Sequence, residues 1–295
     1  MKHVTSLRED NSPSTVKTSL ARMFAAMSLI CIALAACSST PQRFVDEIVT
    51  SWREHRPLPN IDETLTINTA YRIQTRSVRT RLQSASPAGF KAGLTSAPAQ
   101  ARFKTDHAVA GVLFKEGGRK SADTLRLSEL RGLHVEVELA MRIGTAIDQP
   151  LADTAALREH IDGIAPAIEL PNIDYANLQA IDVVDLIATN VSAANYIVGE
   201  FVSPALRDPN SVAVRLSCND QEMMSGKARD ALGDQWQAAL WLVNTLLEQG
   251  WKFEPGEILL TGALGRAIPA AVGRCVASYH AADQPWGTLA VNVVQ

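Results

Sequence analysis

The stretch His134-Val135-Glu136-Val137-Glu138-Leu139 decides the fold, because polar and apolar residues alternate along its whole length. This period of two is typical of a β-strand with one face against a core. It places Glu136 and Glu138 together on the other face, about 7 Å apart along the strand. Two such carboxylates can bind one hard cation where the face is concave. A strand with one solvated face has the same pattern, so the stretch alone leaves both interpretations open.

Beyond Ser86-Pro87 the sequence consists largely of short apolar or alternating runs. They cover residues 135–141, 181–187, 212–217, 258–261 and 289–294, and each predicts a strand. One helix interrupts them, with Asp234 as its candidate N-cap, Gly250 as its stop and an apolar face made by Trp236, Leu240, Val243 and Leu247. A single helix among strands, without regular alternation of strand and helix, favours an α+β fold over a doubly wound sheet.

Two helices are predicted before this β-rich part of the chain. Their apolar faces are separated by the turn Pro57-Leu58-Pro59-Asn60 and consist of Val45, Ile48, Val49 and Trp52 in the first helix and Ile67, Ala70, Gln74 and Val78 in the second. The sequence therefore predicts a small N-terminal helical cap over residues 44–85, followed by a β-rich domain over residues 86–295.

Composition excludes several classes of function. The formal net charge of −3 over 295 residues gives no positive field, so we expect no nucleic-acid partner. The four cysteines, Cys31, Cys37, Cys218 and Cys275, lack the short paired spacing of metal-thiolate and redox motifs. A zinc or redox role is therefore disfavoured.

The first 43 residues have the features of an export signal. Lys2, Arg8, Lys17 and Arg22 precede an apolar run over residues 23–36, which is too short for a transmembrane helix but suits a signal peptide. The run ends in Leu34-Ala35-Ala36-Cys37, which resembles the bacterial lipobox. This predicts a signal peptide over residues 1–36, lipidation of Cys37, a tether over residues 37–43 and an exported, outer-membrane-anchored lipoprotein.

A second interpretation of the N-terminus remains open. The apolar run is also compatible with a buried helix in a cytoplasmic protein whose start has been placed too early. The length of the segment before the run, and the acidic residues Glu9 and Asp10 within it, favour this alternative.

Glu169 and Lys91 are candidate site residues because each is a charge in apolar surroundings. Glu169 lies in a nearly apolar segment over residues 163–171, where a buried carboxylate needs a partner, although a loop carboxylate could also reach solvent or an arginine. With Glu136 and Glu138 it would form an all-oxygen set that favours Mg²⁺ or Mn²⁺ over zinc. Lys91, between Gly89 and Gly93, could bind a carboxylate or transfer protons; the alternative is an exposed surface lysine.

Several of these segments together resemble the 2-keto-4-pentenoate hydratases, relatives of the fumarylacetoacetate hydrolases. The resemblance runs collinearly from about Phe44 to the C-terminus. It is carried by Thr69-Ala70-Tyr71-Arg72-Ile73-Gln74, Phe90-Lys91-Ala92-Gly93-Leu94-Thr95, Val135-Glu136-Val137-Glu138-Leu139-Ala140, Ala165-Pro166-Ala167-Ile168-Glu169, Ser225-Gly226-Lys227, Ala238-Ala239-Leu240-Trp241-Leu242 and Pro255-Gly256-Glu257-Ile258-Leu259-Leu260-Thr261-Gly262-Ala263-Leu264-Gly265.

The resemblance implies a rolled, mostly antiparallel sheet with flanking helices and a homo-oligomeric assembly. It implies a Mg²⁺ or Mn²⁺ ion on Glu136, Glu138 and Glu169, with Lys91 catalytic and Leu94, Asn190, Ser192 and Ser225 binding substrate. The implied activity is hydration of a 2-hydroxypenta-2,4-dienoate-like acid to a 4-hydroxy-2-oxo acid. A related decarboxylase of an unsaturated 2-oxo diacid and a non-catalytic, lipid-anchored protein that binds small 2-oxo acids are the alternatives.

Two positions depart from the pattern of that family. Where its members commonly have Pro-Asp-Phe-Gly, this chain has Ala108-Val109-Ala110-Gly111, and where they have Asp-Asn-Ala-Ser it has Thr189-Asn190-Val191-Ser192. Neither valine nor threonine can replace an aspartate in proton transfer. Asp106 and His107 are close in sequence and are candidate substitutes.

Overall fold

The computed structural model describes Met1 and residues 41–61 and 64–295. The expected signal peptide, Cys37 and the first part of the expected tether lie outside the described residues. Residues 41–43 of that tether are helical, because they belong to a helix over residues 41–54 that buries Phe44, Val45 and Ile48. Within the described part of the chain, no helix combines the length and apolar character needed to cross a membrane.

The larger sheet has eight strands and carries the paired glutamates. Its strands are β1 (Gly89–Gly93), β2 (Val109–Leu113), β3 (Gly118–Arg119), β5 (His134–Ile143), β6 (Ile161–Leu170), β7 (Asn195–Val198), β10 (Ile258–Leu260) and β11 (Ile268–Pro269). They follow the order β2-β1-β10-β5-β6-β7-β3, and β11 also pairs with β5. The β1–β10 and β3–β7 pairs are parallel and the others antiparallel.

A second, five-stranded sheet packs against the first. Its strands are β4 (Thr124–Arg126), β8 (Val212–Cys218), β9 (Gln221–Lys227), β12 (Gly273–Ala281) and β13 (Gln284–Val294), in the order β4-β13-β12-β8-β9. Val135, Val137 and Leu139 of β5 pack in one hydrophobic cluster with side chains of β8, β12 and β13. The predicted strand over residues 135–141 and the α+β class are thus confirmed.

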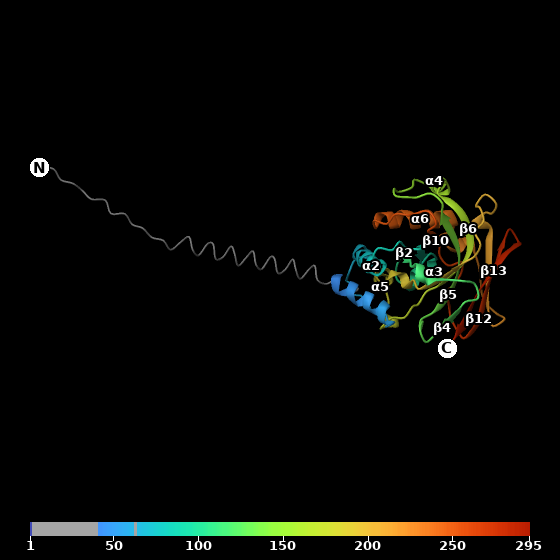
Figure 1. Cartoon of the computed structure of the whole chain (residues 1–295), viewed down its shortest axis with the longest axis horizontal. Helices are drawn as coiled ribbons and strands as arrows, with labels where there is room; N and C mark the ends of the chain where they lie inside the picture. The colour runs from blue at the N-terminus through green and yellow to red at the C-terminus, as the bar shows by residue number, and fades with distance from the viewer. Residues whose placement is uncertain (2–40, 62–63) are drawn as a thin grey trace. The chain divides into compact units, whose positions relative to one another are not determined.

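The other described helices are α2 (Ile67–Leu82), α3 (Ala97–Arg102), α4 (Thr154–Arg158), α5 (Val183–Ala188) and α6 (Gln235–Glu248), with 3₁₀ turns η1 (Lys115–Gly117), η2 (Leu178–Ala180), η3 (Asn190–Ser192), η4 (Pro209–Ser211) and η5 (Ala228–Asp230). In Figure 1 the long strands β5 and β6 lie between helices α2 and α6 on one side and strands β12 and β13 on the other. The predicted helix after Asp234 is confirmed, since the aspartate side chain accepts the backbone N–H groups of Trp236 and Gln237.

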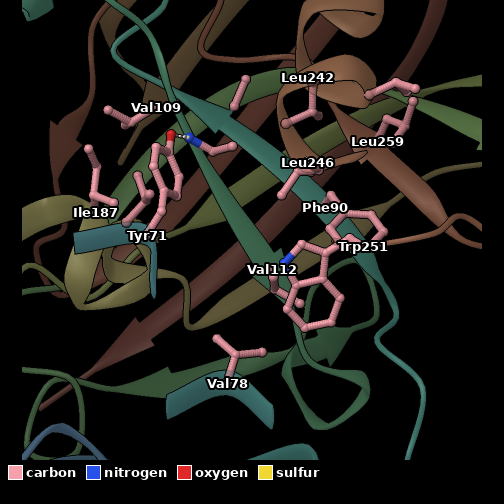
Figure 2. Close-up of a cluster of buried hydrophobic side chains, with 14 of the residues drawn as sticks. Tyr71, Val78, Phe90, Val109, Val112, Ile187, Leu242, Leu246, Trp251 and Leu259 are labelled. Carbon is pink, nitrogen blue, oxygen red and sulfur yellow. Dashed lines mark hydrogen bonds between the residues drawn. The ribbon is translucent and has the colours of Figure 1, made fainter. Parts of the chain in front are cut away.

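The main core lies between the helices and strands β1 and β2. Figure 2 shows Leu242 and Leu246 of α6 beside Phe90 of β1, with Trp251 next to them. Side chains of the two N-terminal helices belong to the same core, and residues Phe44–Gln295 form one compact unit. The expected division at residues 85 and 86 therefore falls inside a continuous hydrophobic core.

One of the predicted strands is wrong. Residues 181–187 were expected to be extended, but α5 occupies Val183–Ala188. Asp182 accepts the N–H groups of Val184 and Asp185, and the Asp185 side chain accepts the N–H of Asp182, which completes a capping box. The short apolar run forms a helix because Asp182 and Asp185 both accept backbone N–H groups at its N-terminal end.

Candidate metal centre and adjoining cavity

Three glutamates meet where β5 pairs with β6. Glu136 lies directly opposite Glu169 in the antiparallel register, and Glu138 follows two residues later on the same face. One carboxylate oxygen from each residue can be chosen so that all three lie within 4.8 Å of one another. The predicted face of β5 therefore does bring its two carboxylates together, and β6 adds the third.

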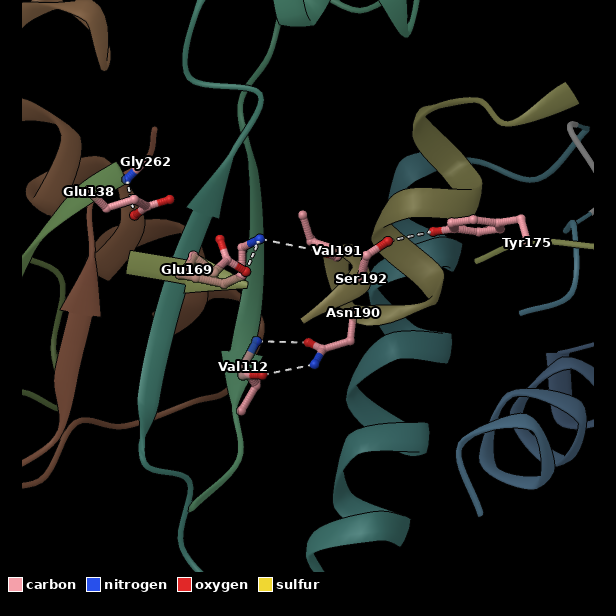
Figure 3. Close-up of polar contacts among 9 residues, drawn as sticks. Val112, Glu138, Glu169, Tyr175, Asn190, Val191, Ser192 and Gly262 are labelled. Carbon is pink, nitrogen blue, oxygen red and sulfur yellow. Dashed lines mark hydrogen bonds and ion pairs between the residues drawn. The ribbon is translucent and has the colours of Figure 1, made fainter. Parts of the chain in front are cut away.

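Burial leaves these carboxylates short of hydrogen-bond donors. Glu138 and Glu169 are both 0% exposed, which excludes a solvated strand face at these two residues. Glu138 Oε2 accepts the backbone N–H of Gly262 at 2.9 Å, as Figure 3 shows. Within the described chain, Glu138 Oε1 and Glu169 Oε2 have no hydrogen-bond partner, and Glu169 Oε1 lies beside the Lys91 ammonium. Three converging anionic oxygen ligands of this kind fit a divalent cation.

The charges of the cluster perturb its own ionisation. Burial raises the pKa of Glu138 well above its ordinary value, and the charges of Glu169 and Glu136 raise it further. Burial raises the pKa of Glu169 to about 7, although the Lys91 charge opposes this rise. Because the pKa values of both carboxyl groups are raised, a divalent cation would bind there in competition with protons.

Lys91 is buried beside the cluster. Its Nζ lies 2.6 Å from Glu169 Oε1 and donates to the Val191 carbonyl at 3.2 Å. Burial would lower the pKa of Lys91, but the charges of the three glutamates outweigh it and hold the pKa above the ordinary value. Lys91 is 2% exposed, so it is not a surface lysine.

A strained turn presents the Val191 carbonyl to Lys91. Asn190, Val191 and Ser192 have consecutive φ angles of 64°, 52° and 53°, which are unfavourable for side chains and most of all for β-branched valine. The Asn190 side chain pins this turn, since its Oδ1 accepts the N–H of Val112 at 2.7 Å and its Nδ2 donates to the Val112 carbonyl at 2.8 Å (Figure 3).

Gly262 is a second position that the local geometry restricts. It has a φ of +105°, and a Cβ atom there would lie 2.4 Å from Thr95 Oγ1. Only glycine fits this conformation and space while directing its N–H at Glu138. The glycine at position 262 is therefore required for this hydrogen bond to Glu138.

A cavity of about 910 Å³ opens next to the cluster. Lys91 and Glu136 lie on its wall, and Ser192 lies between it and a smaller hollow of about 350 Å³. The wall also includes Asp230, several apolar side chains and two exposed arginines: Leu94, Phe103, Ile173, Leu186, Arg102 and Arg266. An apolar cavity with a few convergent charges is typical of a small-molecule site.

Of the four expected substrate-binding residues, two line the cavity and two do not. Leu94 and Ser192 line the cavity. Asn190 is fully buried, and its amide holds Val112, so the structure gives it a role in positioning the turn. Ser225 is exposed on β9 and does not line the cavity.

The positions that depart from the family pattern lie in the protein interior. Val109 is 1% exposed and packs in the main core, and the Thr189 hydroxyl donates to the Asp185 carbonyl at 2.7 Å. Asp106 and His107 pair with each other at 2.9 Å, with side-chain exposures of 88% and 66%. Neither lines the cavity, so the structure offers no observation in favour of either candidate as a substitute for the missing aspartates.

Sequence reasoning missed three residues that shape the site. Gly262 and Val191 stand in segments that the sequence analysis quotes, but they act through backbone groups, so their side chains indicate no role. Tyr175 contacts both Thr189 and Ser192 through its hydroxyl. An isolated tyrosine in the sequence gave no signal for this contact.

Comparison with known proteins supports the family suggested by the motifs. The model of the fumarylacetoacetate (FAA) hydrolase C-terminal family matches residues 103–284. The 2-keto-4-pentenoate hydratase of Paraburkholderia xenovorans strain LB400 is 29% identical over 214 residues, which cover 72% of this chain and 79% of the relative. The 2-hydroxyhexa-2,4-dienoate hydratase of Comamonas testosteroni is 28% identical over 234 residues, covering 77% and 87%.

Solved structures share the fold. The 4-oxalocrotonate decarboxylase from Pseudomonas putida G7, complexed with magnesium and adipate, superimposes with a TM-score of 0.78 at 20% identity, covering 87% of this chain and 98% of that one. Since the family model covers more than half of the sequence, including β5 and β6, the chain belongs to the fumarylacetoacetate hydrolase family.

Proposed function

We propose that the protein is a Mg²⁺-dependent hydratase that converts a 2-hydroxypenta-2,4-dienoate-like acid into a 4-hydroxy-2-oxo acid. The observation that carries this proposal is the convergence of Glu136, Glu138 and Glu169 with a buried lysine at the wall of an apolar cavity. The hydratases among the relatives support it.

The three glutamates would hold the metal ion. Carboxylate oxygens are ligands that suit Mg²⁺, and they suit Mn²⁺ as well. A bound ion would supply Lewis-acid chemistry, because it polarises the 2-oxo and carboxylate oxygens of a chelating acid. Glu138 remains oriented by Gly262, and Glu169 by Lys91.

Lys91 would bind and orient the substrate. An ammonium group has three hydrogens, of which one points to Glu169 and one to the Val191 carbonyl. The third is available to a substrate carboxylate or enol oxygen in the cavity. In the reaction a proton leaves the 2-hydroxyl and another binds C5; water oxygen then bonds to C4, with a proton added at C3. Lys91 would hold the proton at the 2-oxygen.

A decarboxylase of an unsaturated 2-oxo diacid is the second candidate. The fold similarity to 4-oxalocrotonate decarboxylase favours it, and exposed Arg102 and Arg266 on the cavity wall could bind a second carboxylate. Both reactions would use the same glutamates and lysine. A protein that binds 2-oxo acids without turnover is the third candidate, motivated by Val109 and Thr189.

An absorbance assay separates these candidates. The purified protein is mixed with 2-hydroxypenta-2,4-dienoate or with 2-oxohex-3-enedioate, in Mg²⁺ or in EDTA. Mg²⁺-dependent loss of the dienoate with formation of 4-hydroxy-2-oxopentanoate supports the hydratase. Carbon dioxide release from the diacid supports the decarboxylase, and Mg²⁺-dependent binding without turnover of either compound rejects both.

We also propose that the protein is exported and anchored by lipid at Cys37, and that it forms a homo-oligomer. The disulfide between Cys218 and Cys275 supports export, because disulfides persist mainly in oxidising compartments. Radiolabelled palmitate should be incorporated by the parent protein and not by Cys37→Ala. Absence of label in the parent together with free thiols at Cys218 and Cys275 would favour the cytoplasmic alternative. Light scattering measures the oligomer.

A further inference from the structure

A row of three buried hydroxyl groups ends at Ser192, on the cavity wall. Tyr175 Oη lies 2.6 Å from Thr189 Oγ1 and 3.2 Å from Ser192 Oγ, and Figure 3 shows the tyrosine ring directed at Ser192. Thr189 Oγ1 lies 2.7 Å from the backbone oxygen of Asp185. Tyr175, Thr189 and Ser192 are only 6%, 1% and 4% exposed, so bulk water does not compete for these contacts.

The direction of each hydrogen bond follows from a count of hydrogens. A hydroxyl group has one hydrogen and a carbonyl oxygen has none, so Thr189 donates to Asp185. The contact of 2.6 Å between Tyr175 and Thr189 then requires the tyrosine hydrogen, because two oxygens at this distance repel unless one donates. In the remaining contact, the Ser192 hydroxyl must therefore donate its hydrogen to Tyr175 Oη.

Ser192 lines the cavity. Because its single hydroxyl hydrogen is donated to Tyr175, its oxygen can only accept hydrogen bonds from a ligand there. We propose that Ser192 selects hydrogen-bond donors there, and that it binds the C4 hydroxyl of a 4-hydroxy-2-oxo acid and the water molecule from which that hydroxyl is formed. Tyr175 and Thr189 are positioning residues, since they act by fixing the direction of the serine hydrogen. This inference rests on the proposed hydratase function and adds a specificity element to it.

The inference predicts a preference that two variants should remove. In Tyr175→Phe the serine loses its acceptor, and its hydrogen becomes free to turn into the cavity. In Thr189→Val the tyrosine hydrogen loses its acceptor and turns to Ser192 Oγ, which again frees the serine hydrogen. Thr189→Ser keeps the hydroxyl and is the matched control.

Calorimetric titration in Mg²⁺ measures this preference with three ligands. The ligands are 4-hydroxy-2-oxopentanoate, which donates at C4; 4-methoxy-2-oxopentanoate, which only accepts there; and 2-oxopentanoate as the reference. The parent should bind the hydroxy acid about tenfold more tightly than the methoxy acid, because an acceptor facing an acceptor leaves a polar group unpaired. This ratio should fall to about one or below in Tyr175→Phe and Thr189→Val, and persist in Thr189→Ser. Comparing the ratio between proteins cancels the steric effect of the methyl group.

The reference ligand separates the two possible failures. Intact binding of 2-oxopentanoate with equal affinity for the other two acids in the parent would overturn the inference and leave the proposed function standing. An unchanged ratio in both Tyr175→Phe and Thr189→Val would do the same. Loss of Mg²⁺-dependent 2-oxopentanoate binding in the parent would overturn the proposed function and the inference with it.

Discussion

Replacement of Lys91 by methionine tests the electrostatics of the site most directly. The substitution removes the ammonium and keeps a side chain of similar length. It leaves Glu169, which is 0% exposed, without its single ionic partner at 2.6 Å. Glu138, whose pKa is raised by burial and by the same cluster of charges, loses the same stabilising cation.

The magnitude follows from burial. Removing one partner of a buried ion pair typically costs 3–5 kcal/mol, because the other charge stays buried without compensation. We expect Lys91→Met to lower the free energy of unfolding by about 3 kcal/mol at pH 8 in EDTA. The matched control is Arg215→Met: Arg215 and Glu222 pair at 3.0 Å with side-chain exposures of 64% and 50%, and such exposed pairs contribute about 1 kcal/mol at most.

Urea unfolding of the parent and both variants provides the assay. At pH 6 the effect of Lys91→Met should shrink, since Glu169, with a pKa of about 7, then carries a proton. Mg²⁺ should restore more stability to Lys91→Met than it adds to the parent, because no ammonium repels the ion. Equal losses in Lys91→Met and Arg215→Met at pH 8 would refute the reasoning.

Four further predictions follow from other parts of the molecule. Mg²⁺ should raise the melting temperature of the parent and leave that of Glu138→Ala unchanged, since one of three ligands is lost; an equal rise in both would contradict the metal site. Burial raises the pKa of Glu257 to about 7, so the folded state keeps a proton that the unfolded state releases, and stability should fall as pH rises from about 4.5 to 7; Glu257→Gln should flatten this slope in urea titrations. Reduction of the Cys218–Cys275 disulfide, which spans 57 residues, should cost about 4 kcal/mol, and Cys218→Ser should make unfolding insensitive to reductant. Val109→Asp buries a carboxylate in the main core, so its melting temperature should fall without a gain in turnover; a faster, equally stable variant would show that this position reaches the substrate.

The sequence predicts the strand that carries Glu136 and Glu138, but it does not predict that Glu138 is buried. Alternation along residues 134–139 placed Glu136 and Glu138 on one face, but that face could have been solvated. Burial of Glu138 depends on β6 and on Gly262, which come from distant parts of the chain. Long-range register, rather than local pattern, turned a plausible carboxylate pair into a buried cluster.

Two other features differ from what the sequence predicts, each for its own physical reason. Cys218 and Cys275 are too far apart in sequence to suggest a pair, and they meet only because β8 and β12 place them opposite each other. The helix α5 was mistaken for a strand because a short apolar run fits either structure. Here a local signal did exist, since Asp182 and Asp185 have the spacing of a capping box.

The charges at the metal site and on the cavity wall determine which groups could take part in the proposed reaction. Three carboxylates, one ammonium and one divalent ion sum to no net charge, so the site with Mg²⁺ is balanced in apolar surroundings. Of the described residues that line the cavity, the charged ones other than the two arginines are Lys91, Glu136 and Asp230. The arginines stay protonated at neutral pH. The Asp230 side chain already accepts the N–H of Lys227. Val109 and Thr189, which stand where the family pattern has acids, do not line the cavity. In the proposed reaction, proton movement at the substrate would therefore depend on Lys91 and on water held by acceptors such as Ser192. Under the proposed function, turnover should accordingly depend on the orientation of that water.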